Sequence, residues 1–106
     1  MEADILKNTE YVKIFWKHDF TDEPRVIIYE VDLNNNRYML RLIDIYADRT
    51  CKNNDDPYND VIEVLPLENV EEINNGIWGE EISSCLISKE EFEEIWNAHI
   101  YCGSLE

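Results

Sequence analysis

The chain is poor in several residue types on which specialised sites depend. Its 106 residues include three glycines, three cysteines and two histidines. Three scattered glycines cannot form a glycine-rich phosphate loop. Cys51, Cys85 and Cys102 are an odd number with no Cys-x-x-Cys pair, which is typical of free thiols in a reducing compartment. The sequence therefore predicts a cytoplasmic protein without a disulfide framework, and we expect no metal or cofactor.

Long apolar runs and a secretory leader are also missing. The longest apolar runs have four residues, whereas a membrane-spanning helix needs about 20. The stretch from Met1 to Glu10 lacks the basic start and the apolar centre of a signal peptide. We therefore expect no contact with a membrane.

Positive charge is scarce, and the scarcity is uneven. The chain has 24 acidic side chains against 9 lysines and arginines, for a formal net charge of −15. Residues 55–106 carry 14 of the acids and a single base, Lys89. Direct binding to nucleic acid is not expected, because phosphates are bound by Lys and Arg, and attraction runs towards basic proteins instead. The alternative is that the acidic surface only maintains solubility.

What the sequence does contain is the material for one small globular domain. With 44% hydrophobic residues, a chain of this size can bury a core without disulfides or metals. No repeat or Gly/Pro-rich linker divides it. We expect a single domain over residues 1–106, in which residues 1–9 form a loose lead-in.

Alternating side chains predict an antiparallel sheet of about four strands. The alternation, rich in Val, Ile and Tyr, occurs in residues 11–18, 25–33 and 37–46. The asparagines at 34–36 tolerate the positive φ angles of a tight hairpin, so these three strands should form a meander. Residues 51–60 are expected to form an exposed loop, and residues 61–65 a short fourth strand.

Two helices are expected in the second half of the chain. The first covers residues 66–75, with Val70 and Ile73 on one face, and ends at Gly76. A Ser88–Glu91 capping box begins the second. Its apolar stripe consists of Phe92, Ile95, Trp96, His99 and Ile100. The expected fold class is α+β, with the C-terminal helix packed on one face of the sheet and a short helix before it.

The candidate catalytic residues have simpler structural explanations. His18-Asp19 could be half of a metal site, but the second histidine, His99, belongs to the apolar stripe of a helix. Cys85 lies in an apolar segment and is expected to be a buried, inert thiol. We therefore expect no catalytic residue, no metal site and no enzymatic activity.

Surface residues are the remaining candidates for function. Trp78 lies between Gly76 and Gly79, where an exposed indole ringed by carboxylates would anchor a protein interface. Packing of Trp78 onto the core is the alternative. The same acidic flank includes Glu91 and Glu93. The predicted partner-binding residues are Asp55, Asp56, Asp60, Glu71, Glu72, Trp78, Glu80, Glu81, Glu90 and Glu94.

Over residues 10–97 the chain resembles a small, uncharacterised bacterial domain family. The resemblance is carried by Tyr11–Asp19, Asp22-Glu23-Pro24, Tyr29–Asp32, Arg37, Glu81–Ser83 and Ser88–Trp96. Its most specific part is the Trp-x-His-Asp…Asp-Glu-Pro signature. Some members of that family are associated with polymorphic toxin loci, where small acidic proteins serve as immunity proteins. Where the family leads us to expect a glycine after the third strand, this chain has Asp48-Arg49-Thr50.

The resemblance and the charge together predict an immunity protein. It would bind and neutralise a bacterial toxin, a basic nuclease in contact-dependent growth inhibition, because a carboxylate-rich surface complements a cleft built for phosphates. Two alternatives stay open. One is a protein-interaction module with an unrelated regulatory role, and the other is a minor enzyme that uses His18, Asp19 and Glu23.

Overall fold

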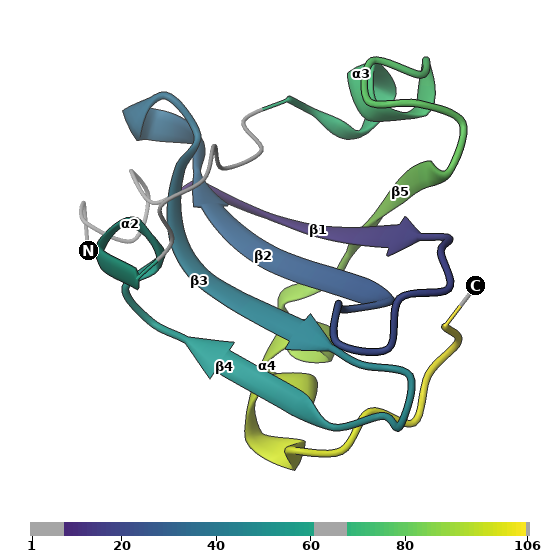
Figure 1. Cartoon of the computed structure of the whole chain (residues 1–106). Coiled ribbons are helices and arrows are strands. Elements are labelled where there is room, and N and C mark those ends of the chain that lie inside the picture. Colours follow the sequence, from purple (N-terminus) through teal and green to yellow (C-terminus); the bar gives the residue numbers. More distant parts are fainter. Residues whose placement is uncertain (1–7, 61–67, 106) are drawn as a thin grey trace.

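An antiparallel five-stranded sheet with a helix on each face forms the body of the protein (Figure 1). The computed structural model describes residues 8–60 and 68–105. The elements are β1 Thr9–Trp16, β2 Val26–Asp32, the 3-10 helix η1 Leu33–Asn35, β3 Tyr38–Ile45, β4 Cys51–Asn54, α2 Pro57–Asp60, α3 Val70–Asn74, β5 Ile82–Ile87 and α4 Lys89–Ala98. The strand order is β4-β3-β2-β1-β5. The α+β class and the meander of the first three strands are therefore confirmed.

Within the described residues the sheet has five strands, and the sequence did not predict two of them, β4 and β5. The prediction of a loop over 51–60 is wrong, because Cys51–Asn54 pairs with β3 and Pro57–Asp60 is helical. β5 pairs with β1 from Tyr11 opposite Ile87 to Trp16 opposite Ile82. Both are edge strands whose residues are exposed or half-buried, apart from the buried Ser84 of β5, so they lack the regular apolar alternation that marks β1 to β3. The predicted strand over 61–65 lies outside the described residues.

The two faces of the sheet carry separate cores. On one face, α4 closes a cluster of Tyr11, Val26, Ile28, Ile43, Ile45, Phe92, Ile95 and Tyr101. On the other, α3 closes a cluster of Val12, Ile14, Tyr29, Val31, Met39, Leu42 and Ile73. The strict alternation along β1 and β2 sends successive side chains to opposite clusters. Each fully buried Ile or Phe contributes about 1.5–3 kcal/mol to stability, so both faces must be covered.

The side chain of Asn74, the last residue of α3, binds the backbone of the edge strand β5. Asn74 Nδ2 donates to the carbonyl of Ser84 at 2.9 Å, and the Ser84 N–H donates to Asn74 Oδ1 at 2.7 Å. Ser84 lies in β5, an edge strand, so the amide of Asn74 satisfies the outward backbone groups that a neighbouring strand would satisfy.

Helix α4 ends earlier than its apolar stripe suggested. It runs from Lys89 to Ala98, and the hydroxyl of its N-cap residue, Ser88, accepts from the Glu91 N–H at 3.0 Å. His99 has a left-handed φ of 67° and is exposed. The prediction that His99 packs within the stripe is therefore wrong, because the chain leaves the helix at that residue. Across the described ranges, none of the helices has the length and apolarity to cross a membrane.

Candidate functional site

A partly buried ionic network seats α4 on the sheet. Arg41 of β3 donates to both carboxylate oxygens of Glu30 in β2, at 2.8 and 3.0 Å. The same guanidinium donates to both oxygens of Glu93 in α4, at 3.2 and 2.6 Å. Tyr11 Oη donates to Glu30 at 2.7 Å. Glu93, assigned from the sequence to the acidic flank, thus turns towards the sheet and fixes the rotation of the helix.

Two aromatic rings of α4 pack against the Arg41 guanidinium, and the surroundings of Glu30 shift its pKa. The Arg41 guanidinium carbon lies 4.6 Å from the ring centroid of Phe92 and 5.0 Å from that of Trp96. Burial raises the pKa of Glu30, but hydrogen bonds from Arg41 and Tyr11 outweigh burial and hold that pKa below its ordinary value. Although Glu30 is only 6% exposed, these hydrogen bonds favour its ionised form.

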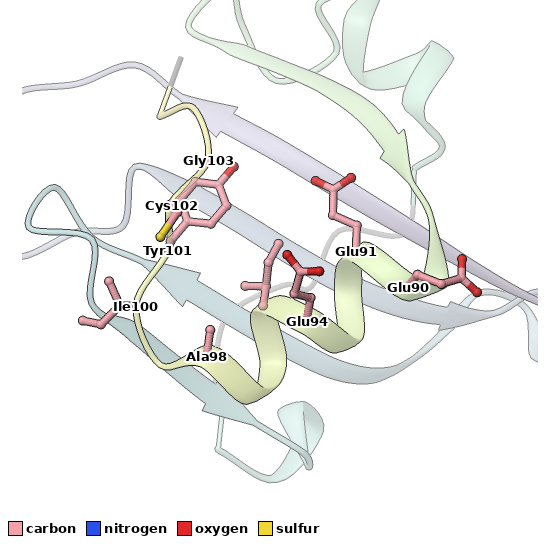
Figure 2. Close-up of a pocket in the computed structure, with 9 residues that line it drawn as sticks. Glu90, Glu91, Glu94, Ala98, Ile100, Tyr101, Cys102 and Gly103 are labelled. Carbon is pink, nitrogen blue, oxygen red and sulfur yellow. The ribbon is translucent and has the colours of Figure 1, made fainter.

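Beside this ionic network, α4 and the chain that follows it line an open groove of about 530 Å³ (Figure 2). The helix side carries Glu90, Glu91 and Glu94, and all three are exposed. The residues of the opposite side and the apolar floor are Ile95, Ala98, Ile100, Tyr101, Cys102 and Gly103. Three carboxylates along an apolar trough suit a ligand that combines positive charge with apolar surface.

The far side of the groove depends on close contacts around Tyr101. Its ring is buried, and its hydroxyl donates to the Ser104 carbonyl at 3.0 Å. A Cβ atom at Gly103 would collide with this ring, so the close approach requires glycine. Lys13 Nζ lies 4.9 Å from the ring centroids of both Tyr101 and Phe15, and Lys13 is only 7% exposed. This lysine is held by aromatic faces on the sheet side.

Arg49 joins the groove to the β3–β4 turn. It has a left-handed φ of 73° at the turn where the family resemblance led us to expect glycine. Its Nη1 donates to the carbonyls of Tyr101 and Gly103, at 3.0 and 2.6 Å, and its own carbonyl accepts from the Tyr101 N–H at 2.9 Å. The Arg49 side chain thus ties the turn to residues 101 and 103, which glycine could not do.

The predicted partner-binding carboxylates do not form a single patch. Glu90 and Glu94 lie together on the groove, whereas Glu71 and Glu72 belong to α3, which packs on the opposite face of the sheet. Both pairs are exposed.

The other predicted residues are spread between these positions. Glu80 and Glu81 border a separate hollow of about 210 Å³ at the end of β1. Asp55 and Asp56 are exposed between β4 and α2, and Asp60 ends α2. Of the predicted residues whose side chains the structure describes, only Glu90 and Glu94, with the flank residue Glu91, line the groove beside α4.

The solvent exposure of Trp78 and Cys85 differs from what the flanking residues in the sequence suggested. Trp78 is half-buried and packs against the core cluster under α3, as the alternative interpretation held, while its neighbour Ile77 is 56% exposed. Cys85 is an exposed thiol on edge strand β5. The prediction that Cys85 is buried is wrong, because alternation along an edge strand left it outside the helix-covered area.

His18 has a structural position in the loop after β1. Its Nε2 bonds to the Pro24 carbonyl at 2.7 Å, and its Nδ1 accepts from the Phe20 N–H at 2.9 Å. Both ring nitrogens are engaged by backbone in this tautomer. Among the described residues, no cluster of three His, Cys, Asp or Glu side chains could hold a metal ion.

Residues 10–101, from the start of β1 to the far side of the groove, match the family model of a domain of unknown function, DUF6881. The chain belongs to this family. Comparison with the curated proteins and with the solved structures finds no match. The DUF6881 segment therefore includes the Glu30–Arg41–Glu93 network and nearly all of the groove.

Sequence reasoning missed the ionic network and the far side of the groove. One signal was available, since Glu30 and Arg41 are charged residues within the mostly apolar strands β2 and β3, at positions that face α4. A charge at an inward strand position indicates a buried ion pair. Nothing in the sequence indicated that residues 100–103 would fold back beside α4.

Proposed function

We propose that this DUF6881 domain is a protein-binding module whose acid-walled groove receives a basic partner. The observation that carries the proposal is the alignment of Glu90, Glu91 and Glu94 along one side of an apolar trough of about 530 Å³. A net charge of −15 adds long-range attraction for a cationic protein. Within this class, we propose the role of an immunity protein that neutralises a basic toxin nuclease by blocking the cleft that binds phosphates.

Matched charge reversals test the groove. The measurement is the association rate with a basic protein recovered by affinity capture from the source cell, over a range of salt concentrations. Glu90→Lys with Glu94→Lys should slow association by about tenfold or more at low salt and reduce its salt dependence. Glu71→Lys with Glu72→Lys is the control, because it makes the same change of charge on the opposite face.

The outcomes separate the parts of the proposal. Equal effects of the two double variants would contradict the groove as the binding site. An association rate that ignores salt and both variants would contradict the electrostatic mechanism. A partner that binds in the groove but has no toxic activity would contradict the immunity role and support the alternative of a regulatory interaction module.

A further inference from the structure

The loop between β1 and β2 presents an aromatic side chain to solvent. Phe20 is 60% exposed. Its ring centroid lies 5.3 Å from that of His18, which in turn lies 4.2 Å from that of Trp16 at the end of β1. The exposed ring is thus the outer member of a cluster of three mutually tilted rings that begins at Trp16 of β1.

His18 holds this loop on both sides of the exposed ring. Its Nδ1 accepts from the N–H of Phe20 itself, at 2.9 Å, and its Nε2 bonds to the Pro24 carbonyl at 2.7 Å. The loop backbone is therefore ordered before any partner arrives. Binding through a pre-ordered side chain avoids part of the conformational entropy cost that a flexible loop would incur.

Phe20 borders a hollow of about 400 Å³ that has an acidic edge. Asp19 and Asp48 line it with Tyr46, and Arg25 is the one base among its described lining residues. Hydrogen bonds from the hydroxyl and the N–H of Thr50 hold the pKa of Asp48 below its ordinary value, so Asp48 remains negative. Two carboxylates beside an exposed aromatic ring complement a surface that is apolar at its centre and cationic around it.

This hollow and the acid-walled groove have a common wall. Thr50 lines the hollow, Ile100 lines the groove, and the two residues form an antiparallel bridge. Ile100 is 52% exposed. One partner surface can therefore extend from the α4 carboxylates across Ile100 to Phe20.

We infer that Phe20 is an anchor residue of the partner interface, and that the partner offers an apolar pocket surrounded by Lys or Arg. This inference rests on the proposed function, because it assigns a second contact to the same basic partner. It adds the requirement that the partner be apolar as well as positive.

Two synthetic peptides of equal length and equal positive charge test the inference. Both contain regularly spaced lysines, with leucine between them in one and serine in the other. The wild type should bind the leucine peptide more tightly, and Phe20→Ala should reduce its affinity for that peptide about tenfold. Leu86→Ala is the matched control, since Leu86 is 56% exposed on β5, and it should leave both affinities unchanged.

A second measurement locates the contact without a variant. On addition of the leucine peptide to the wild type, backbone amide resonances of residues 18–22 should shift at the same concentrations as those of residues 90–94. Binding in which Phe20→Ala keeps the full preference for leucine, or in which the 18–22 resonances do not move, overturns the anchor but leaves the groove. Absence of binding to either peptide overturns the basic-partner function and the anchor with it.

Discussion

Arg41 holds Glu30 by two parallel hydrogen bonds, at 2.8 and 3.0 Å, beneath helix α4. The pair joins β3 to β2, and the additional bonds to Glu93 extend it into the helix. The orientation of α4, and with it the acidic side of the groove, therefore depends on a partly buried network of charges.

Removal of Glu30 should be costly. Glu30→Ala leaves Arg41 with only the outer carboxylate and leaves the Tyr11 hydroxyl without its acceptor, so we expect a loss of about 3 kcal/mol in the free energy of unfolding. Glu93→Ala should cost about 1 kcal/mol or less, because the side chain of Glu93 is 37% exposed. Urea denaturation measures both.

Replacement of both members of the Glu30–Arg41 pair is the control for this prediction. Glu30→Leu with Arg41→Met should recover most of the lost stability, since an apolar pair of similar size avoids the cost of an unpaired charge. If Glu93→Ala destabilised the protein as much as Glu30→Ala, the inner position of Glu30 would not be the decisive one.

Asp44 should make stability depend on pH in the opposite sense from Glu30. Burial raises the pKa of Asp44, with Lys52 opposing the shift and Glu23 adding to it. A raised pKa means that the ionised form is penalised in the fold, and the penalty is present above the folded pKa and disappears below the unfolded value of about 3.9. Asp44→Asn should therefore stabilise the protein at pH 7.

The pH profile of the free energy of unfolding checks this prediction. The advantage of Asp44→Asn over the wild type should shrink as the pH falls through the folded pKa of Asp44. For Glu30, whose folded pKa is lowered, the stabilising effect is lost at low pH, as the pH falls through that pKa. An Asp44→Asn variant that is less stable than the wild type at pH 7 would contradict the assignment.

At position 49, replacement by glycine should be less destabilising than replacement by alanine. Both substitutions remove the bonds to Tyr101 and Gly103, but glycine adopts the left-handed φ of 73° without the steric cost that alanine has. We expect Arg49→Gly to be more stable than Arg49→Ala by about 1 kcal/mol. Equal stabilities would contradict a left-handed turn at this residue.

The same two variants report on the groove. Because each loses the guanidinium that holds residues 101 and 103, hydrogen exchange at the Tyr101 amide should be faster in both than in the wild type.

Asn74 should matter more than its exposed position suggests. Asn74→Ala removes the partners of the Ser84 N–H and carbonyl, so we expect a loss of about 1–3 kcal/mol in the free energy of unfolding. Asn75→Ala, at the neighbouring exposed position, should stay within about 0.5 kcal/mol. Thermal or urea unfolding distinguishes the two, and similar values for both would contradict a strand-like role for Asn74.

The part of the fold that could be predicted is the part where the local sequence strongly favours one type of secondary structure. Alternation over β1 to β3 and the asparagines before Arg37 were sufficient to predict the central meander. β4 and β5 escaped prediction because edge strands pack on fewer sides and tolerate polar residues such as Asn53 and Ser83. Tertiary pairing, and not local preference, decides their conformation.

The candidate site was accessible to prediction only in part. Glu90 and Glu94 were identified from charge and helical spacing, and both line the groove. The roles of Glu93 and Tyr101 could not be found, since each depends on a contact with a residue about 50 positions away: Glu93 with Arg41, and Tyr101 with Arg49.

Several basic side chains are engaged in contacts within the protein, and this makes the surface more negative. Arg41 and Arg37 are held in ion pairs, Arg49 bonds to carbonyl oxygens, and Lys13 lies between aromatic rings. These are four of only 9 lysines and arginines. The exterior is therefore close to that of a polyanion, which should be retained strongly on anion-exchange media and repelled by other copies of itself.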